Sequence, residues 1–547
     1  MDLAELRSLL KSEDPGASAA LEEIIRFEQE DWVTIFHDHS SEEGGELRIA
    51  CFLKPDGIER ALDDPSFDLN GGDGRPGFVG YSDGDGGWNV EYLAVGAEEV
   101  VPLVFHRYFT GPFPNVVELA EDFRLFWDLY EDRQARRFLT TDDVGDVITV
   151  AEWRDGNLRV NKRYLRRYQA ARQFALSLQV VVDRRAADEI AHLTEVSVDI
   201  GEGQYRLAYH GGSGLYDDAR PNFTRLLGKR VIPPPPIERC ELWPYEPARQ
   251  YENFIIGTDA EGEPITHTCD PDELANYFGK NPDAPHYLTP VFFERRVFDK
   301  YYADADRYEV SDGYLRESST WGLRMDNALD DHVAVFLGDL GRDIPYREQQ
   351  YWRSFNIAPP GRMSETAIRR SFLGQFYDSD RIEHRFVTSY RRLQRAWEER
   401  HGWVLFKPPH AGDAHIEHSI HVPTNTSFGQ FDDQIVRLAK LVVDSLNEEE
   451  MSAALAKPVK DEKGIAKLER LLGQLGIASD PLCADLRRAQ GARTRSAAHR
   501  KGGDFDPTTL LAGAADLPAL FSDFLESLVR DFDAVAAAVS QESSSPS

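Results

Sequence analysis

The chain has 547 residues, of which 62 are Lys or Arg and 94 are Asp or Glu, so its formal net charge is -32. A chain of this length exceeds what one hydrophobic core serves, and we expect several domains. Such an acidic chain repels nucleic acid on average, so a nucleic-acid site must be a local basic patch. The 41% hydrophobic content is enough to fill several cores, which excludes a largely disordered protein.

Cysteine usage and hydropathy predict the compartment. The four cysteines are far apart in the sequence, which excludes a zinc site built on thiolates and argues against a disulfide framework. This usage is typical of a reducing compartment. The first residues, MDLAELRSLLKSEDPG, lack the apolar segment of a signal peptide, and no run of about 20 apolar residues follows. We therefore predict a cytoplasmic protein with no membrane segment.

The first part of the chain, residues 1–228, is predicted to be an α+β domain. Apolar residues at helical spacing predict one or two helices within residues 1–30. Residues 116–130 carry Leu119, Phe123, Phe126 and Tyr130 on one helical face, which predicts an amphipathic helix. Short β-type runs and a basic helix complete the domain. The strands are expected at 46–52, 77–81, 88–93, 100–105, 146–152, 158–160 and 176–182, and the basic helix at 161–172.

Pro233–Pro236 is a run of four prolines, which favours a stiff extended spacer. We place a Pro-rich linker and connecting segment at residues 229–285 and a central α+β domain at 286–428. The central domain is predicted to combine strands with helices. The strands are expected at 321–325 and 332–337, and the helices at 366–376 and 386–401.

Residues 429–547 are predicted to be an all-α bundle of four helices with a disordered Ser-rich tail after Val539. Asp480 followed by Pro481 is a good helix start, because Asp caps the first turn and Pro fits its first position. Three apolar stripes support the bundle. They are Phe431, Ile435, Leu438, Val442 and Leu446, then Ile465, Leu468, Leu472 and Leu475, and finally Leu517, Leu520, Phe524, Leu528, Phe532 and Val535.

The third helix of this bundle leads into a basic segment, LRRAQGARTRSAAHRKGG, that is exceptional in so acidic a chain. No acid interrupts its positive charges. Arg495 and His499 are four residues apart and share a helical face, and Arg493 lies on a nearby turn. The positive residues are Arg487, Arg488, Arg493, Arg495, Arg500 and Lys501.

An arginine and a histidine are the residues that RNA cleavage without a metal requires. A base must take the proton of the 2′-OH and an acid must protonate the leaving 5′-oxygen, and histidine serves in either role near neutral pH. A guanidinium binds the charge that builds on the phosphate oxygens. Two copies of the pair, facing each other across a homodimer, would complete one site.

Arg493 and His499, with five residues between them in the third helix of a bundle, resemble the catalytic motif of the HEPN superfamily. The resemblance covers residues 429–547 and implies a metal-independent endoribonuclease of a toxin, abortive-infection or CRISPR-linked system. Arg493 and His499 would be the catalytic pair, and Arg488, Arg495, Arg500 and Lys501 would bind RNA, with no metal or cofactor. Thr494 departs from the Asn, Asp or His that usually follows the arginine in active members.

Two functions therefore fit the sequence. The first is an antiviral-defence or toxin-type effector whose residues 1–428 bind a protein partner or inhibitor and whose C-terminal bundle cuts RNA. The second is a non-enzymatic RNA- or protein-binding subunit of a defence complex, in which the bundle serves for dimerisation. A third, weaker hypothesis is a metal-dependent enzyme built on the histidines of residues 410–421.

The helix at 161–172 is the other nucleic-acid candidate, since its basic residues alternate with Tyr164 and Tyr168. Pairing with acidic neighbours is the competing interpretation, and the acidity of the chain favours it. No Walker A loop, GxSxG elbow or GxGxxG fingerprint follows a predicted strand. The sequence thus contains no sign of ATP hydrolysis, a serine hydrolase or a dinucleotide enzyme.

Overall fold

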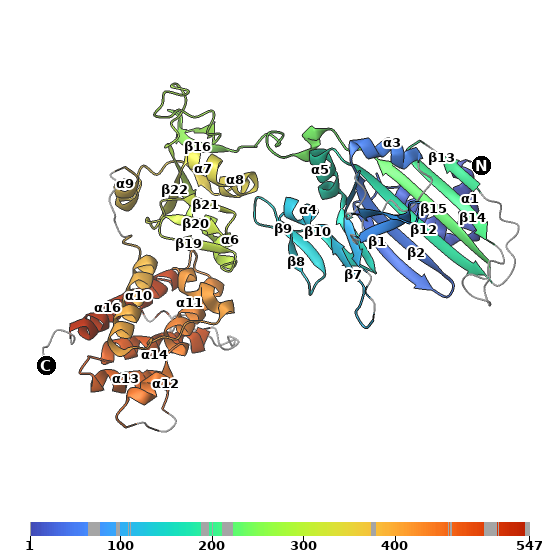
Figure 1. The fold of residues 1–547 in the computed structure, drawn as a ribbon. Helices are drawn as coiled ribbons and strands as arrows, with labels where there is room; N and C mark the ends of the chain where they lie inside the picture. Colours follow the sequence, from blue (N-terminus) through green and yellow to red (C-terminus); the bar gives the residue numbers. More distant parts are fainter. Residues whose placement is uncertain are drawn as a thin grey trace. The chain divides into compact units, whose positions relative to one another are not determined.

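A computed structural model describes residues 2–541 except 64–76, 94–98, 108, 110, 187–195, 200, 211–221, 373–378, 458, 460–461, 497–510 and 512. The chain divides into two compact units (Figure 1). Unit 1 comprises Met1–Asp142 and Asp146–Ala248, and unit 2 comprises Asp143–Gly145 and Arg249–Ser547. The fold is mixed α and β, with antiparallel sheets followed by C-terminal helices.

Unit 1 is built on an 11-stranded sheet with the order β13-β14-β15-β12-β2-β1-β11-β10-β9-β8, and β5 pairs with β2 off this path. The strands are β1 (Trp32–Ser41), β2 (Gly44–Leu53), β3 (Gly77–Ser82), β4 (Trp88–Leu93), β5 (Val100–Pro102), β6 (Val104–Arg107), β7 (Val116–Leu119), β8 (Tyr130–Asp132), β9 (Arg137–Thr141), β10 (Val147–Arg154), β11 (Asn157–Asn161), β12 (Ala175–Ala186), β13 (Val196–Asp199), β14 (Gly203–His210) and β15 (Asn222–Ile232). The helices are α1 (Leu3–Glu13), α2 (Pro15–Ile25), α3 (Pro55–Asp63), α4 (Glu121–Phe126), α5 (Lys162–Arg172) and the 3₁₀-helix η1 (Ile237–Cys240).

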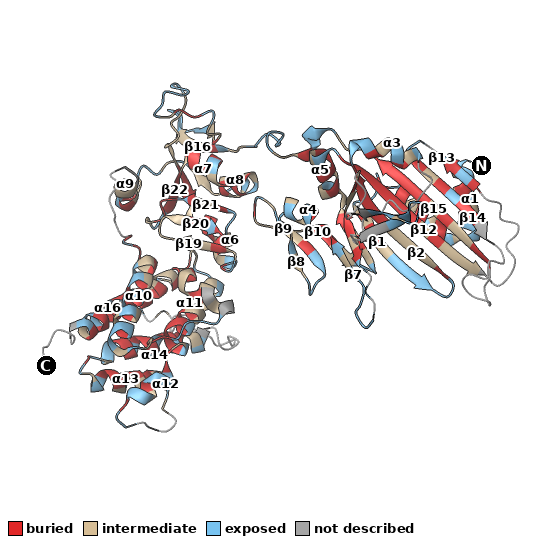
Figure 2. Ribbon diagram, viewed as in Figure 1, coloured by how far each residue is buried: buried red, intermediate tan, exposed pale blue. Residues whose placement is uncertain are grey.

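The central strands of this sheet are buried because both faces are covered (Figure 2). Alternate residues of β12, such as Leu178 and Val180, pack with Leu21 and Ile24 of α2 on one face. Residues of the opposite alternation, such as Ala175, pack with Ala61 of α3. The predicted helices at 1–30 and 161–172 and the predicted strand pair at 146–160 are confirmed.

The helix predicted at 116–130 is wrong. Strand β7 pairs antiparallel with β6 in this region, and the helix α4 that follows ends at Phe126. Asp128 has a positive φ of 50°, which turns the chain into β8. Phe123 is buried as the amphipathic pattern predicted, but Tyr130 is exposed.

The proline run Pro233–Pro236 lies inside unit 1, and not at its boundary after Ala248. It connects β15 to η1 alongside α5. The carbonyl of Pro233 accepts a hydrogen bond from Arg166, and that of Pro235 accepts one from Gln173. The prolines are therefore fixed on the domain by side chains of α5 and its C-terminal cap.

Unit 2 begins with small sheets and continues into helices. Its strands are β16 (Asn253–Thr258), β17 (Pro264–Thr268), β18 (Pro290–Glu294), β19 (Tyr308–Ser311), β20 (Tyr314–Glu317), β21 (Trp321–Arg324), β22 (His332–Phe336) and β23 (Asn356–Ile357). Its helical segments are η2 (Arg295–Phe298), α6 (Asp299–Ala303), α7 (Leu337–Asp343), α8 (Tyr346–Arg353), α9 (Glu365–Phe372), α10 (Ile382–His401), η3 (Ala411–Ser419), α11 (Phe428–Ala439), η4 (Lys440–Asp444), α12 (Glu448–Ala454), α13 (Gly464–Gln474), α14 (Asp480–Ser496) and α16 (Leu517–Gln541).

The helices from α10 to α16 lie together (Figure 1) and share one hydrophobic core. The three apolar stripes expected in this region all face that core, and Leu475 packs against it while only partly buried. Phe386 and Trp397 of α10 also belong to it. The C-terminal core therefore begins at α10, ahead of the boundary expected at residues 428 and 429. A second core, with Phe293 and Trp352, holds the sheets of residues 250–357 together.

Candidate functional site

The basic segment LRRAQGARTRSAAHRKGG begins on α14. The helix buries Leu482, Leu486 and Ala489 against the C-terminal core, and Ala492 continues this face. Arg488, Arg493 and Arg495 lie on α14 within the described residues. His499, Arg500 and Lys501 lie outside the described residues, as does the tail at 542–547.

Arg493 forms an ion pair with a carboxylate from another helix. Its Nη1 lies 2.5 Å from Oδ2 of Asp444, and the two side chains are 25% and 47% exposed. Asp444 is the last residue of η4, a π-helical turn that continues α11. Such π-turns are frequent at functional sites, because they turn a side chain out of the regular helical row.

The other arginines of α14 do not join Arg493 in one patch. Arg488 donates a hydrogen bond of 2.7 Å to Asp485 and lies 4.9 Å from the ring of Phe524. Arg495 donates to the carbonyl of Gly491 on its own helix, at 3.3 Å. Residues 488 and 495 share a helical face, whereas residue 493 lies roughly 160° around the helix from residue 495. Carboxylates from elsewhere in the fold neutralise part of the charge that appeared unopposed in the sequence.

A cleft of about 340 Å³ lies beside Asp444. Asp444 lines this cleft and also binds Arg493, so one carboxylate connects the guanidinium with the cleft wall. Two lysines from separate elements add positive charge to its wall: Lys407 lies 3.8 Å from Glu449, and Nζ of Lys440 lies 3.1 Å from Asp413. The lining residues are Lys407, Pro408, Pro409, Asp413, Ile416, Lys440, Leu441, Asp444 and Ser445.

A neighbouring cleft of about 350 Å³ continues along α11 and shares Lys440 with the first. His415 and Arg437 line it. Nδ1 of His415 lies 2.7 Å from Oδ1 of Asp306. Nη1 of Arg437 is buried without a hydrogen-bond partner in the described part of the chain, and this burial lowers the pKa of the guanidinium.

The histidines of residues 410–421 do not converge. His421 is buried, stacks on Tyr302 with ring centroids 3.4 Å apart, and has its pKa lowered to about 4 by that burial. It is therefore a neutral core side chain at pH 7. His415 faces Asp306. Among the described residues, no group of three His, Cys, Asp or Glu side chains is arranged to hold a metal ion.

Helix α5 uses its basic and aromatic residues for internal contacts. Arg163 and Arg167 both form ion pairs with Glu241, at 3.0 and 3.4 Å. Tyr168 is buried and donates a hydrogen bond of 2.5 Å to Asp122, and Tyr164 packs edge-on against Trp127. These contacts agree with pairing inside the domain and leave no free stacking platform for bases on α5.

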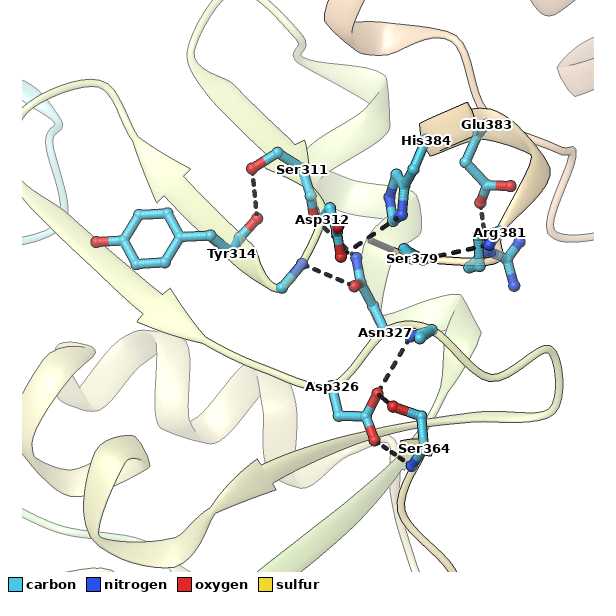
Figure 3. A network of polar contacts seen from close by, with 12 residues as sticks. Ser311, Asp312, Tyr314, Asp326, Asn327, Ser364, Ser379, Arg381, Glu383 and His384 are labelled. Atoms are coloured by element: carbon cyan, nitrogen blue, oxygen red, sulfur yellow. Dashed lines mark hydrogen bonds and ion pairs between the residues drawn. The ribbon is translucent and has the colours of Figure 1, made fainter. Parts of the chain in front are cut away.

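A second candidate site, which was not among the predicted sites, lies among the sheets of unit 2 (Figure 3). It is organised by Asn327, whose Oδ1 accepts a hydrogen bond from the Gly313 backbone and whose Nδ2 donates to the Ser311 carbonyl, at 3.0 and 2.9 Å. These bonds fix the turn between β19 and β20. The turn presents Asp312, which binds Arg370 of α9 through two hydrogen bonds of 2.8 and 2.7 Å.

The same network connects to α10. Nδ1 of His384 lies 3.8 Å from Oδ1 of Asp312. Burial lowers the pKa of His384, so its imidazole is neutral at pH 7. On the other side of the network, Asp326 accepts hydrogen bonds from the backbone and hydroxyl of Ser364, at 2.6 and 2.7 Å, and so fixes the chain just before α9 (Figure 3).

A cavity of about 560 Å³ opens beside this network. Two features of the sequence fall at this cavity. One is the Asp326-Asn327 pair directly after a strand. The other is the pair of glycines within LGDLGRD, which is unusual because glycine destabilises the interior of a helix. Neither feature identifies a ligand by itself. The cavity walls are Tyr287, Leu288, Asp312, Gly313, Tyr314, Arg324, Met325, Asp326, Asn327, Ala328, Ala334, Val335, Phe336, Asp339, Arg342, Met363, Thr366, Ala367 and Arg370.

Neither the family models nor the curated proteins nor the solved structures contain a match to this chain. None of the helices among the described residues is both long and apolar enough to cross a membrane.

Proposed function

We propose that the C-terminal helices of this protein form a metal-independent endoribonuclease of the HEPN type, acting as an antiviral-defence or toxin-type effector. The observation that carries the proposal is the position of Arg493. The guanidinium on the last turns of α14 is bound by Asp444, a carboxylate on a π-turn that also lines a cleft with lysines in its wall. A site that binds a phosphodiester needs a cation in such a place.

The proposed chemistry is an internal displacement at phosphorus. The 2′-oxygen of the substrate forms a bond to phosphorus as the bond to the 5′-oxygen breaks. One histidine takes the proton of the 2′-OH, and a protonated histidine gives a proton to the leaving 5′-oxygen. His499 serves as this acid or base, and Arg493 binds the phosphate oxygens as their charge increases. Two copies of His499, one from each chain of a homodimer, supply both roles.

In the absence of substrate, Asp444 binds Arg493. The carboxylate orients the guanidinium and neutralises it, and a phosphate has to displace or share this contact in order to bind. Lys407 and Lys440 are then in place to hold phosphates along the cleft. Arg488, Arg495, Arg500 and Lys501 remain candidates for contacts to a longer RNA strand. The pairing of Arg493 with Asp444 is a reason to expect modest RNA affinity from the isolated chain.

The decisive experiment is cleavage of single-stranded RNA by the purified protein in EDTA. We expect cleavage by the wild type, and its loss in Arg493→Ala and His499→Ala. Arg487→Ala is the matched control, since Arg487 pairs with Glu469 away from the cleft. Size measurement should show a homodimer. RNA that stays intact with the wild type, with and without added partner proteins, would remove the enzymatic proposal.

A second variant tests the role of Asp444. Asp444→Asn keeps the shape of the side chain but removes the charge that Arg493 faces, so we expect tighter RNA binding than in the wild type. Gel shifts at several salt concentrations measure this, because one more free cation steepens the salt dependence. Unchanged affinity would mean that Arg493 has no contact with RNA.

A second function is favoured by the acids around α14. Glu469, Asp485 and Asp444 each pair with one of its arginines. Such pairing suits a dimerisation or docking module in which residues 1–428 recognise a protein partner and no bond is cleaved. Under this alternative, the protein would dimerise and bind RNA or a protein subunit, and His499→Ala would change neither property.

A further inference from the structure

The 560 Å³ cavity in unit 2 has a size that matches small-molecule sites, which usually measure about 300–1,000 Å³. It lies apart from α14 in the sequence, and its walls come from β20 to β22, α7 and α9. Leu288, Met325, Ala334, Met363 and Ala367 contribute apolar wall. The cavity plays no part in the ribonuclease chemistry proposed above, so its ligand is an independent question.

Among the described residues, one charged side chain of the cavity has no polar partner. Asp312 binds Arg370, and Asp326 binds the Ser364 backbone and hydroxyl. Asp339 lies 2.9 Å from Nη2 of Arg342. Arg324, at the end of β21, is exposed, and its side chain has no hydrogen bond or ion pair within the described residues, although it is close enough to Asp339 to act on its charge. The cavity therefore has one cation available for an anionic ligand.

Asp339 supplies an acceptor on the cavity wall. Its Oδ1 accepts a hydrogen bond of 2.9 Å from the hydroxyl of Tyr287. Burial of Asp339 raises the pKa of its carboxyl, although Tyr287 and Arg342 oppose this effect. Tyr287 lies so close to α7 that a Cβ on Gly338 would be 2.2 Å from its ring. The glycine thus allows Tyr287 to reach Asp339, whose second oxygen remains an acceptor for a ligand hydroxyl.

We propose that this cavity binds a nucleoside monophosphate, with its phosphate on Arg324, a ribose hydroxyl on Asp339, and its base against Tyr314 and Phe336. The three features match a ligand that carries an anion, hydroxyl donors and a flat aromatic group. Charge-assisted bonds from a guanidinium to phosphate are among the strongest polar contacts in proteins. Tyr314 and Phe336 are among the residues that line the cavity, and aromatic side chains provide sequence-tolerant stacking for a base.

The test is isothermal titration of the full-length protein with AMP, GMP, CMP and UMP, beside adenosine and inorganic phosphate as separate ligands. We expect saturable binding of at least one monophosphate at or below about 1 mM. Adenosine and phosphate alone should each bind at least about tenfold more weakly, because each lacks half of the contacts. Arg324→Gln should weaken the monophosphate about tenfold, while Arg296→Gln, which changes an exposed arginine outside the cavity, should leave it unchanged.

Three results would overturn the proposal: no saturable binding of any of the four monophosphates, equal binding of adenosine and AMP, or unchanged affinity in Arg324→Gln. Asp339→Asn provides a second test if Arg324→Gln folds poorly. This variant should weaken the binding of AMP but not the binding of inorganic phosphate. Thermal unfolding of each variant separates loss of the ligand from loss of the fold. None of these measurements contains RNA, so their failure is distinguishable from failure of the ribonuclease proposal.

Discussion

At the scale of single residues, two carboxyl groups face each other inside the C-terminal core. Asp531 of α16 is buried next to Asp485 of α14, and burial together with this neighbour raises the pKa of Asp531 to about 6. Arg530 lies 3.2 Å from Asp531 and 3.6 Å from Asp485, so it compensates only part of the repulsion. A raised carboxyl pKa means that the folded state holds a proton which the unfolded state gives up more easily.

This pair predicts a loss of stability as pH rises. Below pH about 4, Asp531 is protonated in both states, and between about 4 and 6 only the folded state keeps the proton, so stability falls across this window and stays lower above it. Asp531→Asn should therefore stabilise the protein by on the order of 1–3 kcal/mol at pH 7.5 and have little effect at pH 4. Urea unfolding at both pH values measures the difference.

The control for this prediction is Asp523→Asn, which changes an exposed carboxylate on the same helix and should have no pH-dependent effect. If Asp531→Asn destabilises the protein equally at both pH values, the side chain holds the core by its ionised form and the sign above is wrong.

The sequence predicts part of the site on α14. It shows the arginines and their spacing, and the helix that carries Arg488, Arg493 and Arg495 is present. It does not show their partners, because Asp444 is separated from Arg493 by 49 residues. Only the fold brings such charges together.

At the scale of elements, α7 shows how glycines allow a helix to be buried. A Cβ on Gly341 would lie 1.9 Å from the carbonyl oxygen of Cys269, and one on Gly338 would lie in the ring of Tyr287. Both glycines are buried. The helix can therefore approach the neighbouring chain more closely than a helix with side chains at these positions.

Gly338→Ala should displace Tyr287 and break its bond to Asp339. We expect a destabilisation of about 1–3 kcal/mol, as for other overpacked core positions. Gly473→Ala on α13 is the control, because its Cβ would meet nothing within 4 Å and alanine favours the helix by up to about 1 kcal/mol. Thermal and urea unfolding of both variants measure the contrast, and equal stability of the two would contradict the close packing of Tyr287.

The elements that the sequence predicted best were those with a strong period and clear ends, such as α10 and the hairpin of β10 and β11. The prediction of one helix over residues 116–130 was wrong for a physical reason. Phe123 and Phe126 have helical spacing, but Val116 and Val117 are β-branched and pair with β6, a strand that lies just before them in the chain. The amphipathic period was real over α4 alone, which has 6 residues.

At the scale of the whole molecule, each unit has its own hydrophobic core. Among the described residues, no core cluster contains members of both units. Phe52 belongs to a core of unit 1, and Phe293 belongs to one of unit 2. Independent cores predict independent unfolding, because a cavity in one core changes no contact in the other.

Phe52→Ala should destabilise unit 1 by about 3–5 kcal/mol and leave unit 2 unchanged, and Phe293→Ala should do the reverse. Hydrogen exchange followed by mass spectrometry reports both units in one experiment. Faster exchange in both units of a single variant would show that they unfold together.

Domain limits depend on tertiary contacts that composition does not show. Four prolines looked like a spacer, but their carbonyls are bound by Arg166 and Gln173 within unit 1. Apolar stripes located the C-terminal helices correctly, whereas the membership of α10 in the same core depended on contacts with α16 far along the chain. Composition marks a stiff segment, but only tertiary contacts decide whether it is a linker.

The carboxylate of Asp312 has two basic neighbours on different helices, Arg370 of α9 and His384 of α10. If the phosphate bound on Arg324 also drew Arg370 away from Asp312, the Asp312 carboxylate would have less compensation, and the imidazole of His384 would gain affinity for a proton. Binding of a ligand in the cavity would thus favour protonation of His384 on α10, the helix with which the C-terminal core begins. A ligand that makes no contact with that core would change its charge in this way.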